Sequence, residues 1–471
     1  MGSGFGKLAT LVGALIALYG LDKLRRNNIF KSLLAVLLSR LLDNAPFLDS
    51  SEGVWQERHL TPKRVGDCIG FKVKALQVRP IGQGTEDDST GLMSAMFRVG
   101  LTYEDGAGSA QQTRSKGLPL PPPASLIVKL SPPFFGVRLI GTIFGLFNAE
   151  VRFYADGIGG TVGVKTPNCY HAALEGHTHR CCIIAEDMAP RRPPDQFGAM
   201  TETMACEAVT ELALLHSHYH NQIRAKMPST DWVLTMDSDR LMPIAMGQYY
   251  KQVDFFLAFA AKIGKPVTVK TRALAEVLRV RGPSFHKLAE LSPRELGGPT
   301  ATTLTHGDFR PENIFFGDGQ PVTMIDFQLA KESPGEFDLT WMVTQGWPVD
   351  TRRQREMAVI EAYYTRMCEL VPPTGPGQTN GQAAGAASGG MDALELVCVQ
   401  YSAQAAIILF QMGLTAKDAA AAIQSQEKNL KLITALYERL WAFIEDWNTL
   451  PIMSALLDNV DDAVRDQAVG G

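Results

Sequence analysis

The segment LTHGDFRPENIFFGDGQPVTMIDFQ, residues 304–328, places three oxygen-bearing side chains close together in the chain. Asp308 and Asn313 lie five residues apart in a polar loop, and Asp326 follows the short apolar run 322–325. Such a run is typical of a buried strand. A strand, a tight turn and a polar loop can bring the three side chains to one place, so we expect them to form a single site.

These residue types suit the transfer of the terminal phosphoryl group of ATP to an alcohol. The phosphate charge must be neutralised by a divalent cation, and Mg²⁺ prefers oxygen ligands, a role that Asn313 and Asp326 fit. A separate carboxylate must accept the proton of the attacking hydroxyl, which typically accelerates transfer by about 10²–10⁴-fold, and Asp308 fits this role. The alternative is that Asp308 and Asn313 only form turns. Turn formation does not predict the whole ordered pattern.

The string HGDFRPEN followed by MIDFQ resembles the catalytic signature of the aminoglycoside phosphotransferase and choline kinase-like superfamily, especially its ecdysteroid kinase-like branch. This resemblance implies an α+β, protein-kinase-like fold with two lobes. The small lobe would be an antiparallel β-sheet with a helix, and the large lobe would be mainly helical. ATP and Mg²⁺ are the implied cofactors.

The resemblance also implies roles for individual residues. Asp308 would be the catalytic base, and Asn313 and Asp326 would hold Mg²⁺. Asp338, in the string GEFDL, would brace the catalytic loop from the start of a following helix, and we assign His306 to the same structural support of the site.

A kinase-like fold needs a lysine on an upstream strand and a glutamate on the next helix. Residues 125–130, SLIVKL, predict an apolar strand that carries Lys129, and residues 147–156, FNAEVRFYAD, predict a helix with Glu150 beside its apolar stripe. We therefore expect Lys129 to hold the ATP phosphates and to pair with Glu150. The alternatives are a strand-end lysine that reaches solvent and a glutamate on a solvated helix face.

The loop that would cover the phosphates lies between the predicted strands 71–78 and 93–103. It has no GxGxxG, but the pattern that begins at Gly91 and Ser94 resembles the version found in the family. Gly91 would let backbone N–H groups approach the phosphates, and the Ser94 hydroxyl would add a donor. The acidic residues 86–88 are expected to face solvent.

The segment that would bind adenine follows the apolar run 181–185, which predicts a strand paired with another at 168–173. The triplet Glu186, Asp187 and Met188 resembles the hinge of the family. We expect the contact with adenine to come mainly from main-chain groups there.

The chain divides into regions of different composition. Two insertions within the lobes are rich in Gly, Pro and small residues and are predicted to be mobile. The predicted order is an apolar, basic N-terminal segment (1–48), a small lobe (49–190, with the insertion 105–123), a helical large lobe with the catalytic loop (191–450, with the insertion 372–390) and a C-terminal tail (451–471).

The N-terminal segment indicates an intracellular protein with membrane contact through residues 5–42. Residues 8–21 are apolar but short for a bilayer span, and residues 1–42 hold six Lys or Arg and one acid. A membrane-surface anchor and an organelle presequence both fit this pattern, as does a helical hairpin packed on the small lobe. The seven cysteines form no CxxC, which argues against a disulfide framework and favours a reducing compartment.

The net charge and the spacing of the histidines bear on whether the chain binds nucleic acid or a metal through histidine. The net charge of −4 gives no basic footprint, so no nucleic-acid partner is expected. His216 and His220 lie four residues apart, a spacing that sometimes binds metal, but no third ligand stands beside them. We therefore expect a structural role for His216.

The acceptor is expected to be a small molecule with a hydroxyl group. Only twelve positions separate Asp326 from Asp338, too few for the long activation loop with which a protein kinase docks a polypeptide, and no APE motif is present. The sequence does not choose among acceptors. The alternative function is a non-catalytic, kinase-like binding or scaffold protein at a membrane. The degenerate glycine loop and the apolar N-terminus favour this alternative.

Overall fold

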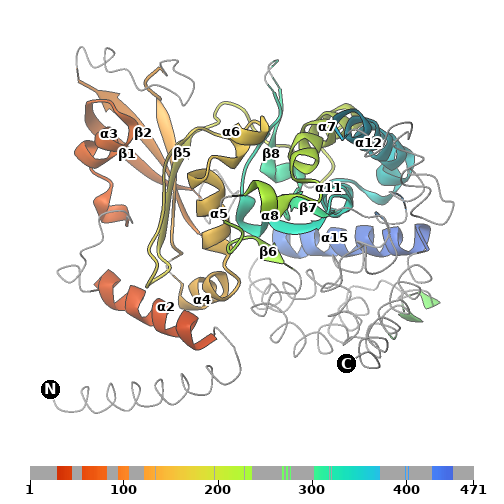
Figure 1. Cartoon of the computed structure of the whole chain (residues 1–471), viewed down its shortest axis with the longest axis horizontal. Coiled ribbons are helices and arrows are strands. Elements are labelled where there is room, and N and C mark those ends of the chain that lie inside the picture. Colours follow the sequence, from red (N-terminus) through yellow and green to blue (C-terminus); the bar gives the residue numbers. More distant parts are fainter. Residues whose placement is uncertain are drawn as a thin grey trace. The chain divides into compact units, whose positions relative to one another are not determined.

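The computed structural model of the chain (Figure 1) describes the residues on which the account below rests. They are 29–44, 56–81, 94–104, 121–132, 134–195, 197–227, 229–235, 268, 269, 272, 273, 276, 302–317, 319, 321–371, 398, 401 and 427–448. The predictions for Gly91, for the acidic residues 86–88, for the apolar run 8–21, for most of the first insertion and for all of the second lie outside them.

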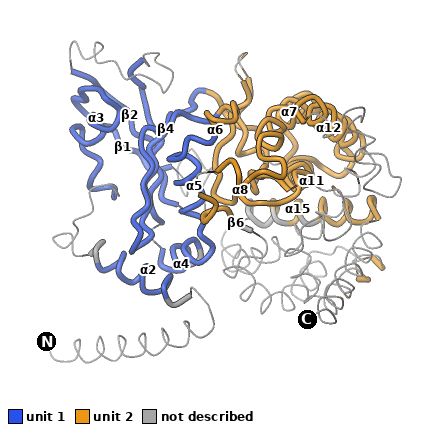
Figure 2. Tube along the Cα trace, viewed as in Figure 1, with its two compact units in different colours: residues 1–158, 166–190 blue, residues 159–165, 191–471 orange. Residues whose placement is uncertain are grey.

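The chain forms two compact units (Figure 2), which are residues 1–158 with 166–190 and residues 159–165 with 191–471. Unit 1 ends at Pro190, the last residue of the predicted small lobe. Residues 159–165 were predicted to belong to that lobe and are instead part of unit 2.

Unit 1 is built on a five-stranded sheet in which all neighbouring strands are antiparallel, in the order β1-β2-β3-β5-β4. The strands are β1 Val73–Ile81, β2 Ala95–Tyr103, β3 Ser125–Leu130, β4 Cys169–Leu174 and β5 Cys181–Glu186. The helices of unit 1 are α2 Ile29–Asn44, η2 Glu57–His59, α3 Pro62–Ile69, α4 Phe135–Ile143 and α5 Leu146–Ala155, η denoting a 3₁₀ helix. The short helix α6 Ile158–Val162 belongs, apart from Ile158, to unit 2.

Strand β5 shows how both faces of this sheet are covered. Cys182 and Ile184 belong to a buried cluster with residues of α3 and β1–β3. Cys181, Ile183 and Ala185 belong to a second cluster with residues of α5. Successive side chains of a strand point to opposite faces, so a strand covered on both sides reads as an uninterrupted apolar run.

The same alternation fixes the direction of Lys129 in β3. Leu126, Val128 and Leu130 lie in the cluster on the α3 side of the sheet. Lys129 therefore points to the α5 side, and its partner in the register is Ile183, which belongs to the α5 cluster.

Helix α2 packs against α4 within unit 1. The guanidinium of Arg138 in α4 is buried and donates a hydrogen bond from Nη1 to the Ser39 hydroxyl of α2 at 2.6 Å, and from Nε to the Pro132 carbonyl at 3.0 Å. Val36 is fully buried beside them. The described part of the N-terminal segment is thus a helix packed within unit 1, whereas the predicted hairpin also includes residues outside the described ones.

Unit 2 combines small sheets with long helices. Strands β6 Leu234–Thr235, β10 Lys331–Pro334 and β7 Thr302–Thr305 form one sheet in this order, and β8 Ile314–Phe315 pairs with β9 Thr323–Met324. Helix α7 packs on α12 and β7, and α11 packs on α12 and α15. The helical elements are α7 Glu202–Tyr219, α8 Ile223–Lys226, η4 Pro311–Asn313, η5 Phe327–Leu329, α11 Glu336–Gly346, α12 Val349–Leu370 and α15 Glu427–Asp446.

The antiparallel sheet with helix α5 in unit 1 and the mainly helical unit 2 confirm the predicted α+β, kinase-like fold class. The sequence did not predict helices α3 and α4 or strand β10.

Candidate active site

The predicted catalytic loop begins where β7 ends, and its first turn requires a glycine. Gly307 has a φ of 81°, in the left-handed region that residues with a side chain rarely adopt. A Cβ at this position would collide with the main-chain carbonyl of Leu329. The close approach brings the loop against the segment that follows Asp326.

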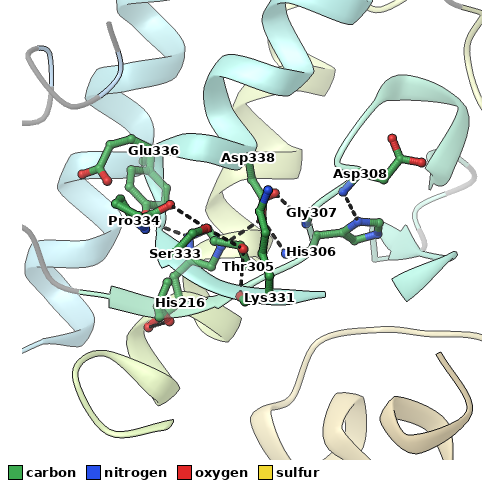
Figure 3. A network of polar contacts seen from close by, with 12 residues as sticks. His216, Thr305, His306, Gly307, Asp308, Lys331, Ser333, Pro334, Glu336 and Asp338 are labelled. Carbon is green, nitrogen blue, oxygen red and sulfur yellow. Dashed lines mark hydrogen bonds and ion pairs between the residues drawn. The ribbon is translucent and has the colours of Figure 1, made fainter. Parts of the chain in front are cut away.

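The carboxylate of Asp338, in the first turn of α11, holds this loop through its main chain. Oδ2 accepts a hydrogen bond from the His306 N–H at 2.7 Å, and Oδ1 accepts one from the Gly307 N–H at 2.9 Å. Figure 3 shows Asp338 beside the main chain of both residues. The bracing contact that the resemblance implies is therefore present.

Asp338 is in turn held by His216 of α7. His216 Nε2 lies 3.2 Å from Asp338 Oδ2, and Nδ1 lies 2.8 Å from the Tyr363 hydroxyl of α12. Burial alone would raise the pKa of Asp338, but the hydrogen bond and charge of His216 and the N–H of Gly307 outweigh it and lower that pKa. His216 is fully buried in this network, which confirms the structural role predicted for it.

The imidazole of His306 links the loop to the strand before Asp326. Its Nε2 donates to the Ile325 carbonyl at 2.8 Å, which leaves Nδ1 to accept the Asp308 N–H at 3.3 Å. The ring also packs against Phe327, at 4.4 Å between centroids. Both contacts keep Asp308 and Asp326 on neighbouring segments.

The side chain of Asp308 is buried and is held by two hydrogen bonds and an ion pair. The Trp341 indole donates from Nε1 to Oδ1 at 3.0 Å, and the Asn313 amide donates to Oδ2 at 3.1 Å. Arg310 forms an ion pair with Oδ2 at 3.5 Å. In Figure 3 the Asp308 carboxylate points away from the network around Asp338.

The electrostatic environment raises the pKa of Asp308. Burial is the main cause, and the charge of Asp326 adds to it, whereas Arg310, His306 and the Trp341 hydrogen bond act in the opposite direction. A carboxylate with a raised pKa is a better proton acceptor than an ordinary surface Asp.

Asn313 and Asp326 are brought together by the main chain. The Ile325 N–H donates to the Asn313 carbonyl at 3.0 Å, so Asp326 follows directly beside η4. Asn313 Nδ2 donates to both the main-chain carbonyl and Oδ2 of Asp308, which directs its Oδ1 away from Asp308. Two hard oxygen donors on adjacent segments match the ligand preference of Mg²⁺.

A buried lysine lies next to this site. The Lys331 side chain of β10 is 3% exposed, and its Nζ lies 3.2 Å from the centroid of the Phe337 ring without a hydrogen bond to any described residue. Phe337 also stacks on Trp341, at 5.8 Å between ring centroids. Burial lowers the pKa of Lys331 to about 7, although Asp338 and Asp308 counteract it.

In unit 1 the predicted ion pair is present. Lys129 Nζ lies 2.6 Å from Glu150 Oε2, and the two side chains are 13% and 8% exposed. This contact confirms the predicted pairing and excludes the two solvent-facing alternatives. The phosphate-binding role of Lys129 stays a prediction.

Ser94, Glu186, Asp187 and Met188 are the other described residues of unit 1 that were predicted to bind ATP. The carboxylate of Glu186 accepts two hydrogen bonds from Asn168, and that of Asp187 accepts one each from Arg98 and Ser125, both at 2.8 Å. Both carboxylates are thus held by neighbouring side chains of unit 1, and the adenine-binding role of residues 186–188 stays a prediction. The hydroxyl of Ser94 is buried and forms no hydrogen bond within the described part of the chain.

Sequence reasoning missed Trp341 and Arg310 as neighbours of Asp308. Arg310 lies within the quoted motif, so its place in the loop could have indicated the contact. Trp341 is 33 residues away from Asp308. Only its position one helical turn after Asp338 pointed to the same side of α11.

A model of the ecdysteroid kinase-like family matches residues 89–372, which is more than half of the chain and includes every residue from Gly91 to Asp338 considered above. No curated protein matches the chain by sequence.

Several solved structures resemble the chain at low identity. The choline kinase of Cryptosporidium parvum Iowa II is 11% identical over 81% of this chain and 93% of its own, with a TM-score of 0.47. A choline/ethanolamine kinase family protein of Mesorhizobium loti is 14% identical over 82% and 92%, with a TM-score of 0.40. A spectinomycin phosphotransferase, solved with ADP and spectinomycin, is 13% identical over 83% and 98%, with a TM-score of 0.43.

Proposed function

We propose, because the chain belongs to the ecdysteroid kinase-like family, that it transfers the γ-phosphoryl group of ATP to a hydroxyl group of a small molecule, with Mg²⁺ as cofactor. The observation that carries this proposal is the state of Asp308. It is a buried carboxylate with a raised pKa, held by Trp341 and Asn313 on a loop that Asp338 braces. ATP as the donor would place the activity inside the cell.

Asp308 would orient the acceptor hydroxyl and take its proton. Each carboxylate oxygen has two lone-pair sites, and the N–H donors of Trp341 and Asn313 occupy one on each oxygen. The remaining sites can accept the O–H of the substrate. Because both oxygens are held by neighbouring side chains, little reorientation is needed when the hydroxyl arrives.

Asn313 and Asp326 would hold the metal through Oδ1 and a carboxylate oxygen. The bound Mg²⁺ would offset the negative charge of the phosphate groups. The amide of Asn313 would interact with two groups. Its NH₂ group donates to Asp308, and its oxygen points away from Asp308 and would bind the metal. Arg310 lies near both Asp308 and Asp326 and reduces the repulsion between the two carboxylates.

Lys129 would bind the ATP phosphates. Its position on β3 is fixed by the sheet register, and the 2.6 Å contact with Glu150 fixes the direction of its ammonium group. A cation positioned in this way loses little side-chain entropy when a phosphate binds.

The segment after Asp326 supports a small acceptor. The chain passes from η5 into β10 and reaches α11 at Glu336, with only Ala330 and Gly335 between these elements. Strand β10 lies between β6 and β7. No residue remains there to form the polypeptide-docking loop of a protein kinase.

Binding of Mg-ATP tests the donor side of the proposal. We expect Mg-ATP to raise the melting temperature of the protein, and we expect Asp326→Ala to weaken Mg-ATP binding at least about tenfold, because a charged metal ligand is lost. Calorimetric titration with ATP, with and without Mg²⁺, measures the difference. Asp195→Ala, which removes a carboxylate in the loop before α7, is the control. If no nucleotide changes the melting temperature, the protein is instead a non-catalytic, kinase-like binding protein.

The hydrogen bond from Trp341 to Asp308 should affect how the transfer rate depends on pH. The indole N–H lowers the pKa of Asp308. Trp341→Phe keeps an aromatic ring on Phe337 but removes the donor, so we expect the acid limb of the transfer rate to move to higher pH and the rate near neutral pH to fall about tenfold. The KM for ATP should not change. An acid limb that stays in place in Trp341→Phe would contradict this role.

Labelled ATP and a panel of hydroxylated metabolites and lipids would identify the acceptor. Hydrolysis of Mg-ATP, in which water replaces the alcohol, provides a measurable reaction until an acceptor is found. A protein that binds Mg-ATP but transfers phosphate to no member of the panel and to no water would contradict the proposed activity.

A further inference from the structure

Helix α2 exposes a row of large apolar side chains. One side of the helix is buried and carries Ser32, Ala35, Val36 and Ser39, the side that contacts α4. Leu34, Leu38 and Leu41 lie at helical spacing outside this buried side and are 48%, 37% and 55% exposed. We call these three residues the leucine face.

Unit 1 exposes one further large apolar side chain, near α4. Phe134, directly before α4, is 68% exposed. Within unit 1, α2 and α4 lie side by side (Figure 1). Of the seven large apolar residues that are exposed in the described part of the chain, four belong to α2 or to the residue before α4. Single exposed leucines are ordinary, whereas three on one side of the same helix indicate an interaction site.

The leucine face is held in a fixed position. Arg138 is buried and bonds to Ser39 through Nη1, and Val36 is fully buried. The helix therefore cannot turn its leucines inward without breaking these contacts, which would leave a buried guanidinium without its hydroxyl partner.

Charge indicates the kind of partner. Lys31, one turn before Leu34, is exposed, and Arg40, which precedes Leu41 in the sequence and lies beside the leucine face, is exposed as well. Residues 1–42 hold six Lys or Arg and one acid, although the whole chain has a net charge of −4. A helix that combines exposed leucines with basic residues is typical of segments that lie in the surface of an anionic membrane.

We propose that the leucine face docks unit 1 onto an anionic lipid bilayer, with α2 lying in the plane of the interface. Among the described residues, no helix combines the length and the apolar character that crossing a bilayer requires. The docking is independent of the proposed phosphotransferase activity, and the binding test below reads neither ATP nor transfer.

Flotation of the full-length protein with vesicles tests the proposal. We expect binding to vesicles of phosphatidylcholine with phosphatidylserine, weak binding to phosphatidylcholine alone, and a decrease as salt is added. The triple variant Leu34→Ser, Leu38→Ser, Leu41→Ser should bind the anionic vesicles at least about tenfold more weakly. Lys31→Gln should weaken binding about fivefold.

A matched control removes exposed apolar side chains elsewhere. Phe197→Ser, Val269→Ser and Met357→Ser together change three exposed residues of unit 2 and should leave vesicle binding unchanged. Unchanged melting temperatures and circular dichroism spectra would show that both triple variants are folded. Equal binding by the leucine variant and the wild type would overturn the proposal.

Two other occupants of the leucine face can be distinguished. If deletion of residues 2–28 creates vesicle binding that the full-length protein lacks, the N-terminal segment covers the face, and the proposal is wrong. If the full-length protein is a dimer in sedimentation and the leucine variant is a monomer with unchanged vesicle binding, the face binds a second copy, and the proposal is also wrong. Retained salt-sensitive binding after the deletion supports it.

Discussion

We expect Asp308→Asn to lower the rate of phosphoryl transfer by about 10²–10⁴-fold, with little change in the affinity for Mg-ATP. The amide has nearly the same shape as the carboxylate and can still accept the Trp341 N–H, so the loop should keep its conformation. It cannot take the proton of the attacking hydroxyl. Steady-state rates of ATP turnover, with the acceptor or with water, measure the first effect, and calorimetric titration measures the second.

Glu312→Gln is the control for this variant. Glu312 lies four residues further along the same loop and pairs with Arg310 at 3.4 Å, and its side chain is 39% exposed. It also changes a carboxylate to an amide, so both variants alter net charge equally. We expect nearly wild-type rates. Rapid transfer by Asp308→Asn would mean that another group accepts the proton, and the assignment of Asp308 as the base would be wrong.

We expect Asp338→Asn to lower the free energy of unfolding by about 3 kcal/mol and to reduce transfer at least about a hundredfold. The carboxylate accepts two main-chain N–H groups, from His306 and Gly307, and it is fully buried. An amide has only one oxygen, so its NH₂ group must face one of these donors or His216. Urea unfolding and transfer assays measure the two effects.

The dependence on pH separates the loss of the charge from a general loss of packing. The lowered pKa of Asp338 means that its contribution to stability is present above the ordinary pKa of an unfolded Asp, near pH 4, and is lost as pH falls toward the lower value of the folded state. The difference in unfolding free energy between wild type and Asp338→Asn should therefore shrink below about pH 4. A difference that is constant with pH would contradict this origin.

The control for Asp338→Asn is Asp350→Asn in α12. Asp350 is 88% exposed and forms an ion pair with Arg353, which is itself half exposed. Pairs of this kind contribute little to stability, so we expect a change below about 1 kcal/mol and no effect on transfer.

The sequence was most informative where local patterns and side-chain chemistry coincide. The predicted strand 125–130 has the bounds of β3, because an apolar run with a single lysine marks it clearly in the sequence. The pairing of Lys129 with Glu150 was predicted from the resemblance to kinases, because a kinase-like fold places a strand and the next helix on one side of the sheet. The bracing role of Asp338 came from the order of motifs rather than from periodicity.

Long-range contacts were beyond the reach of the sequence. The hydrogen bond from Trp341 to Asp308 depends on how α11 packs beside the loop, and Trp341 in a helix reads as an ordinary core residue. Strand β10 was missed because KESP is polar and contains proline, yet it is held between β6 and β7. Its ladder bonds and the burial of Lys331 and Ser333 override its weak strand propensity.

The role of the N-terminal segment also could not be predicted from the sequence pattern alone. The sequence left an anchor, a presequence and a packed hairpin open, because an apolar run with basic flanks satisfies all three. Burial distinguishes the two sides of the helix, since Val36 is buried while Leu34 and Leu41 are about half exposed. The packed helix and the membrane contact are therefore compatible.

Strand β10 also bears on how the proposed enzyme could be controlled. Ser333 is 4% exposed, and its hydroxyl lies 2.8 Å from the Thr305 hydroxyl of β7, inside the sheet that leads into the catalytic loop. Protein kinases commonly switch by phosphorylation that orders a loop at this point of the chain. Here the corresponding residues are already ordered and are out of reach of a modifying enzyme. The segment that follows Asp326 thus supports the catalytic loop as a strand of its sheet, and its only hydroxyl is buried between β10 and β7.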